Sequence, residues 1–306
     1  MNKLPIVQYP LTTIMLDDDP VFLEGMKFNL NNSFIKFSTD QKEVKCFIKK
    51  HQQSGINYGK IMNYCYPEEI SEKRMSINLG LIEEKINDDR KQNEFIVLVI
   101  DYDMPIQNGL DICEEIKADN VYKILLTGAA SMPEVVNAYN NKLINMYIDK
   151  SNENLVEVLN IEIVEAQQTY FQKFSANILS AINLDTNVKC YLGNRQYIDF
   201  ISQYINEYNI VELYLFDHAG SYLIKDYNGC KSRLHIADLD MVKGVLESLQ
   251  EDIDPKIRDD IKRRNKMLCV KNIDSYDKKM NFSKYMVNCN KIAAGSDLYY
   301  SIVPCQ

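Results

Sequence analysis

Acidic, hydroxyl and basic side chains stand at the ends of four short apolar segments in the first half of the chain. In sequence order they are Asp17 and Asp18, then Asp101, then Thr127, and finally Lys150. Each follows a run of apolar residues that is typical of a buried strand. Side chains at the carboxyl ends of neighbouring parallel strands converge on one crevice. The pattern therefore predicts a single site with three carboxylates, a hydroxyl and an ammonium.

A site of this composition suits the transfer of a phosphoryl group to an aspartate. A small hard cation such as Mg²⁺ prefers oxygen ligands, and proteins usually hold it with one or two carboxylates together with the substrate phosphate. Phosphoryl transfer depends mainly on positioning and on neutralisation of charge. Asp101 is then the candidate nucleophile. Because three close carboxylates repel one another, we expect a raised pKa in at least one of them.

These residues resemble the receiver domain of two-component response regulators, and the resemblance covers roughly the first half of the chain. The matching positions are Asp17-Asp18, Asp101-x-x-Met104-Pro105-x-x-x-Gly109, Thr127 and Lys150. The resemblance implies that Mg²⁺ is bound by Asp17, Asp18, Asp101 and the backbone carbonyl of Asp103. It also implies that Asp101 is the phosphoacceptor, Thr127 the switch hydroxyl, Lys150 the partner of the phosphoryl group and Tyr147 the aromatic residue that reorients.

Three features depart from the family pattern. Ser151 follows the lysine where the family commonly has a proline. Without that proline, the sequence leaves open how rigidly the backbone holds Lys150. Asp103 adds a carboxylate where a neutral side chain is more frequent. Asp17 and Asp101 are 84 residues apart, which is about twice the usual spacing in the family, so we expect an insertion near residues 52–77. Its apolar content predicts an ordered, partly helical excursion packed against the receiver or a partner.

The fold class expected is α/β. We expect a doubly wound, five-stranded parallel sheet of the flavodoxin type in a receiver domain at residues 1–152. An apolar stripe without Gly or Pro predicts a long linking helix over residues 153–185. Residues 186–306 predict an α+β output domain with an antiparallel sheet. Strands are expected there at 211–216, 221–225, 267–270, 284–287 and 298–303.

The output domain carries a basic cluster that has two interpretations. The cluster consists of Lys262, Arg263, Arg264 and Lys266. Contact with a phosphate of a nucleic acid or nucleotide is one interpretation; a solvated helix face, paired with Asp259 and Asp260 at helical spacing, is the other. The domain also resembles the output module of quorum-sensing response regulators from Legionella-type bacteria, which implies a role in quorum sensing or transcription regulation.

Composition limits the classes of partner. The net charge of −8 argues against a dedicated electrostatic binder of nucleic acid. No apolar run reaches the roughly 18 residues of a membrane-spanning helix, and no secretion signal is expected at the N-terminus. The chain has 8 cysteines without a C-x-x-C pair. These predict reduced thiols in a cytoplasmic protein rather than a zinc site.

The resemblance implies a response regulator that accepts phosphate from a sensor histidine kinase and forms a homodimer when phosphorylated. It is not expected to be an enzyme beyond dephosphorylating itself. Two alternatives remain open at this point. One is a receiver-like interaction module that works without phosphorylation. The other is a phosphatase of the haloacid-dehalogenase kind, because Asp101-x-Asp103 resembles the nucleophile motif of that family.

Overall fold

The computed structural model divides into two compact units. It describes residues 4–30, 34–51, 62–65, 74–116, 121–128, 132–182, 189–248, 255–263, 266–269 and 286–305. One unit comprises Pro10–Tyr58 and Asn87–Phe174, and we call it the α/β unit. The other comprises Met1–Tyr9, Gly59–Ile86 and Ser175–Gln306, and we call it the antiparallel unit. No helix in the described part of the chain is both long and apolar enough to span a bilayer.

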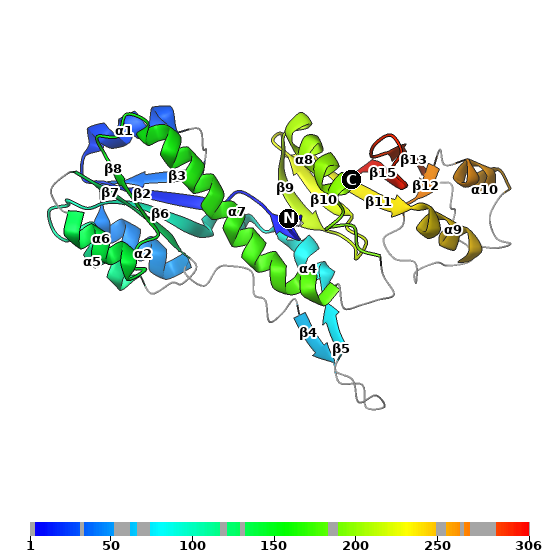
Figure 1. The fold of residues 1–306 in the computed structure, drawn as a ribbon, viewed down its shortest axis with the longest axis horizontal. Helices are drawn as coiled ribbons and strands as arrows, with labels where there is room; N and C mark the ends of the chain where they lie inside the picture. The colour runs from blue at the N-terminus through cyan, green and yellow to red at the C-terminus, as the bar shows by residue number, and fades with distance from the viewer. Residues whose placement is uncertain are drawn as a thin grey trace. The chain divides into compact units, whose positions relative to one another are not determined.

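The α/β unit is built on a parallel sheet with the strand order β3-β2-β6-β7-β8 (Figure 1). Its strands are β2 (Thr12–Leu16), β3 (Ile35–Ser38), β6 (Phe95–Asp101), β7 (Tyr122–Thr127) and β8 (Met146–Asp149). The central strands β2 and β6 are buried along their whole length. Burial of this kind is expected where helices cover both faces of a parallel sheet. The sheet is the doubly wound one that the sequence predicts.

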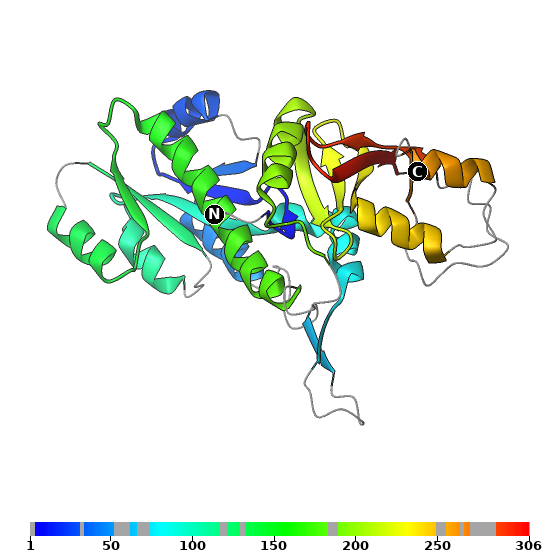
Figure 2. The ribbon, with the colours of Figure 1, turned by 45° about the vertical axis from the view of Figure 1, so that its right-hand side comes forward.

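Helices cover both faces of this sheet. They are α1 (Pro20–Asn29), α2 (Gln41–His51), α5 (Gly109–Glu115), α6 (Met132–Asn140) and the first part of α7 (Leu155–Ile182). α2, α5 and α6 share one apolar core with the strands, to which they contribute Val44, Ile112 and Val135. α1 and α7 lie on the opposite face (Figures 1 and 2). The two helix layers leave the carboxyl ends of the strands open at one edge, where ligands bind in such folds.

The last helix of the α/β unit continues into the antiparallel unit. α7 runs from Leu155 to Ile182, and the division between the units falls after Phe174. Its buried residues recur at three- and four-residue steps, as the stripe in the sequence predicts. They include Leu155, Leu159, Ile163, Ala166, Phe174 and Ile178.

The antiparallel unit contains a sheet with the strand order β1-β9-β10-β11-β15-β14. The strands are β1 (Val7–Gln8), β9 (Ile210–Leu215), β10 (Tyr222–Asp226), β11 (Lys231–Asp238), β14 (Asn290–Lys291) and β15 (Leu298–Pro304). Further elements are α8 (Arg195–Glu207), α9 (Leu239–Ser248), α10 (Pro255–Lys262) and a ribbon of β12 (Lys266–Leu268) with β13 (Met286–Asn288). Helices that accompany an antiparallel sheet make this an α+β arrangement, as predicted.

β11 is absent from the strands that the sequence predicts, although it is paired on both sides. Arg233 and His235 alternate with Leu234 and Ile236, and an alternation this short is a weak signal of a strand. In the structure these side chains are accommodated by an aromatic ring: the Arg233 guanidinium lies 5.1 Å from the centre of Phe216, and the His235 ring packs edge-on against the same ring. Phe216 contacts these two side chains only in the folded protein, so the local hydrophobic pattern does not reveal the contact.

The insertion differs from its prediction in structure and in placement. Its described residues form β4 (Met62–Cys65), which pairs with β5 (Arg74–Ile77), rather than a helix; residues 52–61 and 66–73 lie outside the described part. Residues Gly59–Ile86 are grouped with the antiparallel unit, whereas the sequence predicts that the insertion packs against the receiver or a partner. After β5, the short helix α4 (Leu79–Glu84) gives way to 3-10 turns at Lys85–Asn87 and Asp89–Asn93.

The N-terminus also joins the antiparallel unit, whereas the sequence analysis assigns it to the receiver. β1 pairs with β9, and the Ile6 backbone N–H donates to the Ser175 hydroxyl at 2.9 Å. The partners are far apart in sequence, and strand pairing over such a distance leaves no signal in the local hydrophobic pattern.

Candidate phosphoacceptor site

The acidic pair lies where β2 ends and α1 begins. Asp17 is fully buried and Asp18 is exposed. The Asp19 backbone N–H donates to Asp17 Oδ1 at 3.0 Å, and Asp19 in turn caps α1 by accepting from the Val21 N–H at 2.8 Å. An Asp at the N-cap followed by a Pro at the first helical position, as in Asp19-Pro20, is a favoured start for a helix. The local sequence therefore turns the chain sharply after β2 and holds the Asp17 carboxylate at the strand end.

Asp101 is the last residue of β6, the strand next to β2, and it is 3% exposed. The backbone N–H of Asp103 donates a hydrogen bond to its carboxylate. The following loop returns close to the strand, since the Gly109 N–H donates to the Tyr102 carbonyl at 3.0 Å. A Cβ at Gly109 would lie 2.2 Å from the Asp101 carbonyl oxygen. Glycine is required here because α5 begins in contact with the backbone of Asp101.

Thr127 and Lys150 come from the next two strands. Thr127 ends β7, and its hydroxyl donates to the Gly128 carbonyl at 2.8 Å. Lys150 follows β8, and its backbone N–H donates to the Thr127 carbonyl at 2.9 Å. The Lys150 ammonium reaches across the strand ends: Nζ lies 2.8 Å from Asp17 Oδ2 and 2.9 Å from Asp101 Oδ1. The four segments singled out in the sequence thus meet at one edge of the sheet.

Burial and charge compete at this cluster. Burial raises the pKa of Asp101, the hydrogen bond from Lys150 lowers it, and the neighbouring charge of Asp17 raises it, with a net increase above the ordinary value. Burial lowers the pKa of Lys150, but the bonds to Asp17 and Asp101 outweigh this effect and the pKa is raised. The ammonium also lies 4.7 Å from the centre of the Phe22 ring. Lys150 therefore stays charged and partly neutralises two buried carboxylates.

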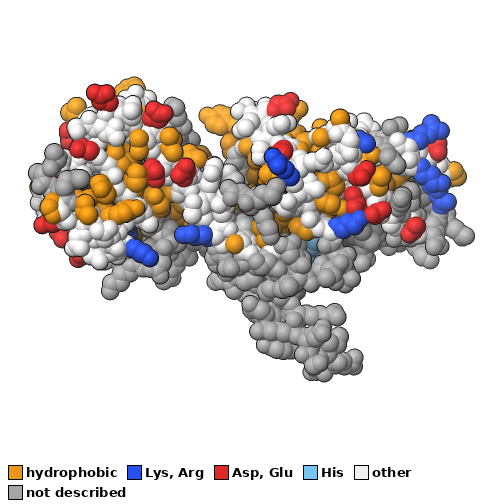
Figure 3. All heavy atoms as spheres, viewed as in Figure 1, with side chains coloured by type: hydrophobic (Ala, Val, Ile, Leu, Met, Phe, Trp, Pro, Cys, Tyr) orange, Lys and Arg blue, Asp and Glu red, His pale blue; other side chains and the backbone are white. Residues whose placement is uncertain are grey.

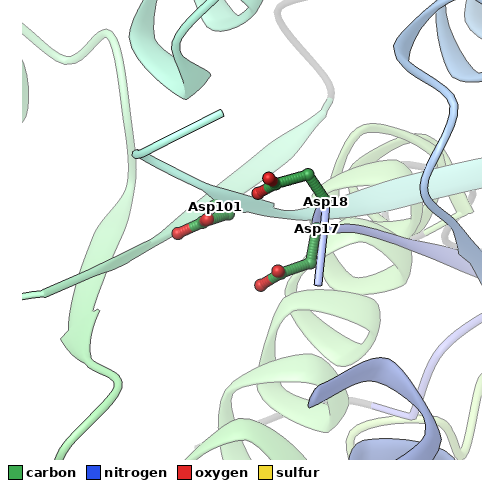
Figure 4. Close-up of side chains that lie close together, drawn as sticks. All are labelled: Asp17, Asp18 and Asp101. Carbon is green, nitrogen blue, oxygen red and sulfur yellow. The ribbon is translucent and has the colours of Figure 1, made fainter. Parts of the chain in front are cut away.

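The carboxylates fit a hard divalent cation. Asp17, Asp18 and Asp101 each offer an oxygen, and these atoms lie within 4.8 Å of one another. Figure 4 shows the three side chains directed into the same space from the ends of neighbouring segments. An all-oxygen set with net negative charge is the environment that Mg²⁺ prefers. The side chain of Asp103 is exposed and lies outside this group.

A hydrogen-bonded turn stands where the family commonly has a proline. Asp149 Oδ1 accepts from the Ser151 N–H at 2.8 Å and from the Ser151 hydroxyl at 2.7 Å, and the Asn152 N–H donates to the Asp149 carbonyl at 3.0 Å. The sequence analysis did not single out Asp149. Its signal is an Asp two residues before a Ser at a strand end, which is typical of an Asx turn. This turn holds the backbone on both sides of Lys150.

Tyr147 lies on β8 and is partly buried. Its ring packs edge-on against Tyr139 of α6 with 5.9 Å between ring centres, and it also contacts the apolar core beneath α6. The ring therefore sits at the boundary between core and surface on the side of the sheet that α6 covers.

Two of the four residues in the basic cluster of the antiparallel unit form ion pairs. Arg263 lies 2.7 Å from Asp259, and Lys266 lies 2.9 Å from Asp260. Lys262 is exposed at the end of α10, and Arg264 lies outside the described residues. Figure 3 shows basic side chains in this region with acidic ones among them. This geometry favours the solvated-face interpretation over a phosphate site.

Comparison with solved structures identifies the fold. The Legionella pneumophila response regulator LqsR matches with a TM-score of 0.72 and 23% identity, covering 99% of this chain and 90% of that one. A receiver-domain protein from Clostridium thermocellum covers 52% of this chain and 96% of its own, at 18% identity and a TM-score of 0.35. No protein-family model and no curated protein sequence matches. Over nearly its whole length, the chain therefore has the same fold as that Legionella response regulator.

Proposed function

We propose that this protein is a response regulator of a two-component phosphorelay and that Asp101 is its phosphoacceptor. The supporting observation is the Lys150 ammonium, which bridges Asp17 and Asp101 within a cluster of three carboxylates. A structural ion pair needs one carboxylate, whereas transfer of a phosphoryl group to an aspartate needs a cation site, a nucleophile and a second positive charge together. The arrangement supplies all three.

In the proposed reaction, a carboxylate oxygen of Asp101 attacks phosphorus. The new O–P bond forms as the P–N bond to the donor histidine breaks, and the imidazole nitrogen leaves with the electron pair. Mg²⁺ held by Asp17, Asp18 and Asp101, with the Asp103 carbonyl as a further ligand, would neutralise charge on the phosphoryl oxygens. Lys150 pairs with another of these oxygens, so its positive charge stabilises the product.

The switch proposed for the modified protein uses Thr127 and Tyr147. Phosphorylation adds about 1.5 to 2 negative charges and three strong acceptor oxygens. The Thr127 hydroxyl, bonded here to the Gly128 carbonyl, turns to donate to one of these oxygens, and Tyr147 moves into the space that it leaves. Moving a two-state equilibrium from 1:99 to 99:1 takes about 5.5 kcal/mol, to which several new charge-assisted hydrogen bonds contribute.

The output is proposed to be a change in dimerisation or in exposure of the antiparallel unit. α7 is the physical connection, because one uninterrupted helix belongs to both units. A sensor histidine kinase is the proposed phosphodonor. The cytoplasm is the proposed location of this protein, and regulation within a quorum-sensing pathway is the proposed context. The negative net charge and the ion-paired basic cluster give no support to nucleic acid as a direct partner.

Labelling with a small phosphodonor tests the proposal. The wild type, incubated with Mg²⁺, should gain one phosphoryl group by intact-mass measurement, and Asp101→Asn should gain none. Labelling should also change the mass in solution or the protease sensitivity of α7. A wild type that stays unlabelled at saturating Mg²⁺ would favour the phosphorylation-independent module. Repeated hydrolysis of a generic phosphomonoester would instead favour the phosphatase.

A further inference from the structure

The loop between β6 and α5 determines how Asp101 is presented. This loop, residues 102–108, contains Asp103, whose N–H donates to the Asp101 carboxylate. Within the loop, the Met104 N–H donates to the Tyr102 carbonyl at 3.2 Å. Its outer part at Pro105 and Ile106 is exposed. A loop with an exposed tip needs side-chain contacts if its inner residues are to keep one conformation.

Those contacts converge on Gln107. The Gln41 amide of α2 donates to the Gln107 carbonyl at 3.1 Å, and the Gln107 amide donates to Glu115 Oε1 of α5 at 2.7 Å. Lys45 of α2 donates to Gln107 Oε1. Lys45 Nζ also lies 2.8 Å from Glu115 Oε2. The backbone and both ends of the Gln107 side chain are thereby tied to two different helices.

Charge and burial make Lys45 the central member of this network. Its side chain is 24% exposed, less than that of Glu115 at 49%. Hydrogen bonds from Gln107 and Lys45 lower the pKa of Glu115 below its ordinary value. At neutral pH a cation is therefore held between a carboxylate and an amide oxygen, and hydrogen bonds to charged groups are stronger than neutral ones.

A groove joins this network to the metal-binding carboxylates. It has a volume of about 420 Å³, and its walls include Asp18, Lys42, Lys45, Ile106 and Gln107. A displacement of the loop at Gln107 is thus a displacement of a wall of the groove that Asp18 also lines. Ligand sites held by supporting residues lose affinity when that support is removed.

We propose that Lys45 is a positioning residue for the phosphoacceptor site. Through Gln107 and Glu115 it holds the 102–108 loop in the conformation in which Asp103 orients the Asp101 carboxylate. This inference rests on the proposed function, because the site that Lys45 supports is the proposed phosphoacceptor site. What it predicts is binding of Mg²⁺, which can be measured without any phosphoryl transfer. Lys45 does not touch the reacting atoms; it acts through the loop.

Titration of Mg²⁺ by calorimetry tests this inference on the full-length protein. Lys45→Met and Gln107→Ala should each weaken Mg²⁺ binding about fivefold, the factor that corresponds to one net hydrogen bond of about 1 kcal/mol. Lys45→Arg should retain most of the affinity. The matched control is Lys42→Met, which removes one positive charge from the same helix and the same groove. It should bind Mg²⁺ at least as tightly as the wild type, because loss of a cation favours another cation.

Hydrogen exchange provides a second readout that a general loss of stability would not reproduce. Without Mg²⁺, Lys45→Met should exchange faster in residues 102–108 than the Lys42→Met control, while the strands β2 and β6 exchange at the control rate. Equal Mg²⁺ affinity in the two lysine variants would overturn the inference, and so would faster exchange spread over the whole α/β unit. If the wild type binds Mg²⁺ but takes no phosphoryl group, the proposed function fails while this comparison still decides the role of Lys45.

Discussion

Replacement of Lys150 by Met tests the balance of charge at the phosphoacceptor site. Lys150 Nζ pairs with two carboxylates whose side chains are 0% and 5% exposed, those of Asp17 and Asp101. Removal of one partner from a fully buried ion pair destabilises a protein by about 3–5 kcal/mol, because the remaining charge is uncompensated. The Lys150 side chain is 25% exposed, and solvent screens it in part. We therefore expect a loss of about 2 kcal/mol at neutral pH.

The loss should depend on pH in a defined direction. The pKa of Asp101 is raised by burial even with Lys150 present, and removal of the ammonium raises it further. A carboxyl group with a raised folded-state pKa lowers stability at pH values above that pKa. This penalty fades as the pH falls through the folded pKa towards the unfolded value of about 4. The difference between Lys150→Met and the wild type should therefore be largest at neutral to alkaline pH and should shrink in acid.

Urea unfolding between pH 5 and pH 8 measures this difference. The chain has 20 Tyr and no Trp, so circular dichroism and tyrosine fluorescence are the natural probes. Hydrogen exchange of β6 assigns the relevant transition to the α/β unit. Lys42→Met is again the control for loss of one positive charge. Mg²⁺ at a hundred times its Kd should return about 2.7 kcal/mol to any variant that still binds it. A deficit that is absent, or that stays constant from pH 5 to pH 8, would refute the reasoning.

Three further perturbations have defined outcomes. Gly109→Ala should lower the free energy of unfolding by about 3 kcal/mol, because the added Cβ would lie 2.2 Å from the Asp101 carbonyl oxygen. Gly25→Ala is the control, since nothing lies within 4 Å of its Cβ, and it should not destabilise the protein in the same urea assay. Asp149→Ala removes the acceptor that holds the turn after β8. We expect slower labelling by a phosphodonor with little change in Mg²⁺ affinity, and an unchanged rate would contradict this. Burial lowers the pKa of His235 to about 4, so stability of the antiparallel unit should fall by about 2 to 3 kcal/mol between pH 7 and pH 4.5 as the unfolded state takes up the proton. His235→Phe should flatten that decline in denaturation curves at the two pH values.

The candidate site was largely predictable from the sequence because its residues sit at strand ends. An apolar strand that ends in an acidic, hydroxyl or basic residue is a local pattern. Parallel packing then brings those ends to one edge without further information. Asp17, Asp101, Thr127 and Lys150 were found in this way, and the structure places all four there.

The features that were not predictable depend on contacts between distant segments. β11 carries Arg233 and His235 in a strand, where both side chains pack against the ring of Phe216. The N-terminal β1 and the β4–β5 insertion belong to the antiparallel unit although they precede or interrupt the α/β unit in sequence. A hydrophobic pattern shows that a segment is buried, but it does not show which core the segment joins.

The sequence alone determined which groups the site contains, since three carboxylates, a hydroxyl and an ammonium stand at the ends of four strand-like segments. Tertiary structure decided how firmly those groups are held. The Gln107 network beside Asp101 is made by side chains of α2 and α5, whose partners are set by the fold. The physical reason is that strand periodicity is a short-range property of the chain, whereas the orientation of a carboxylate depends on hydrogen bonds between helices that only folding brings together.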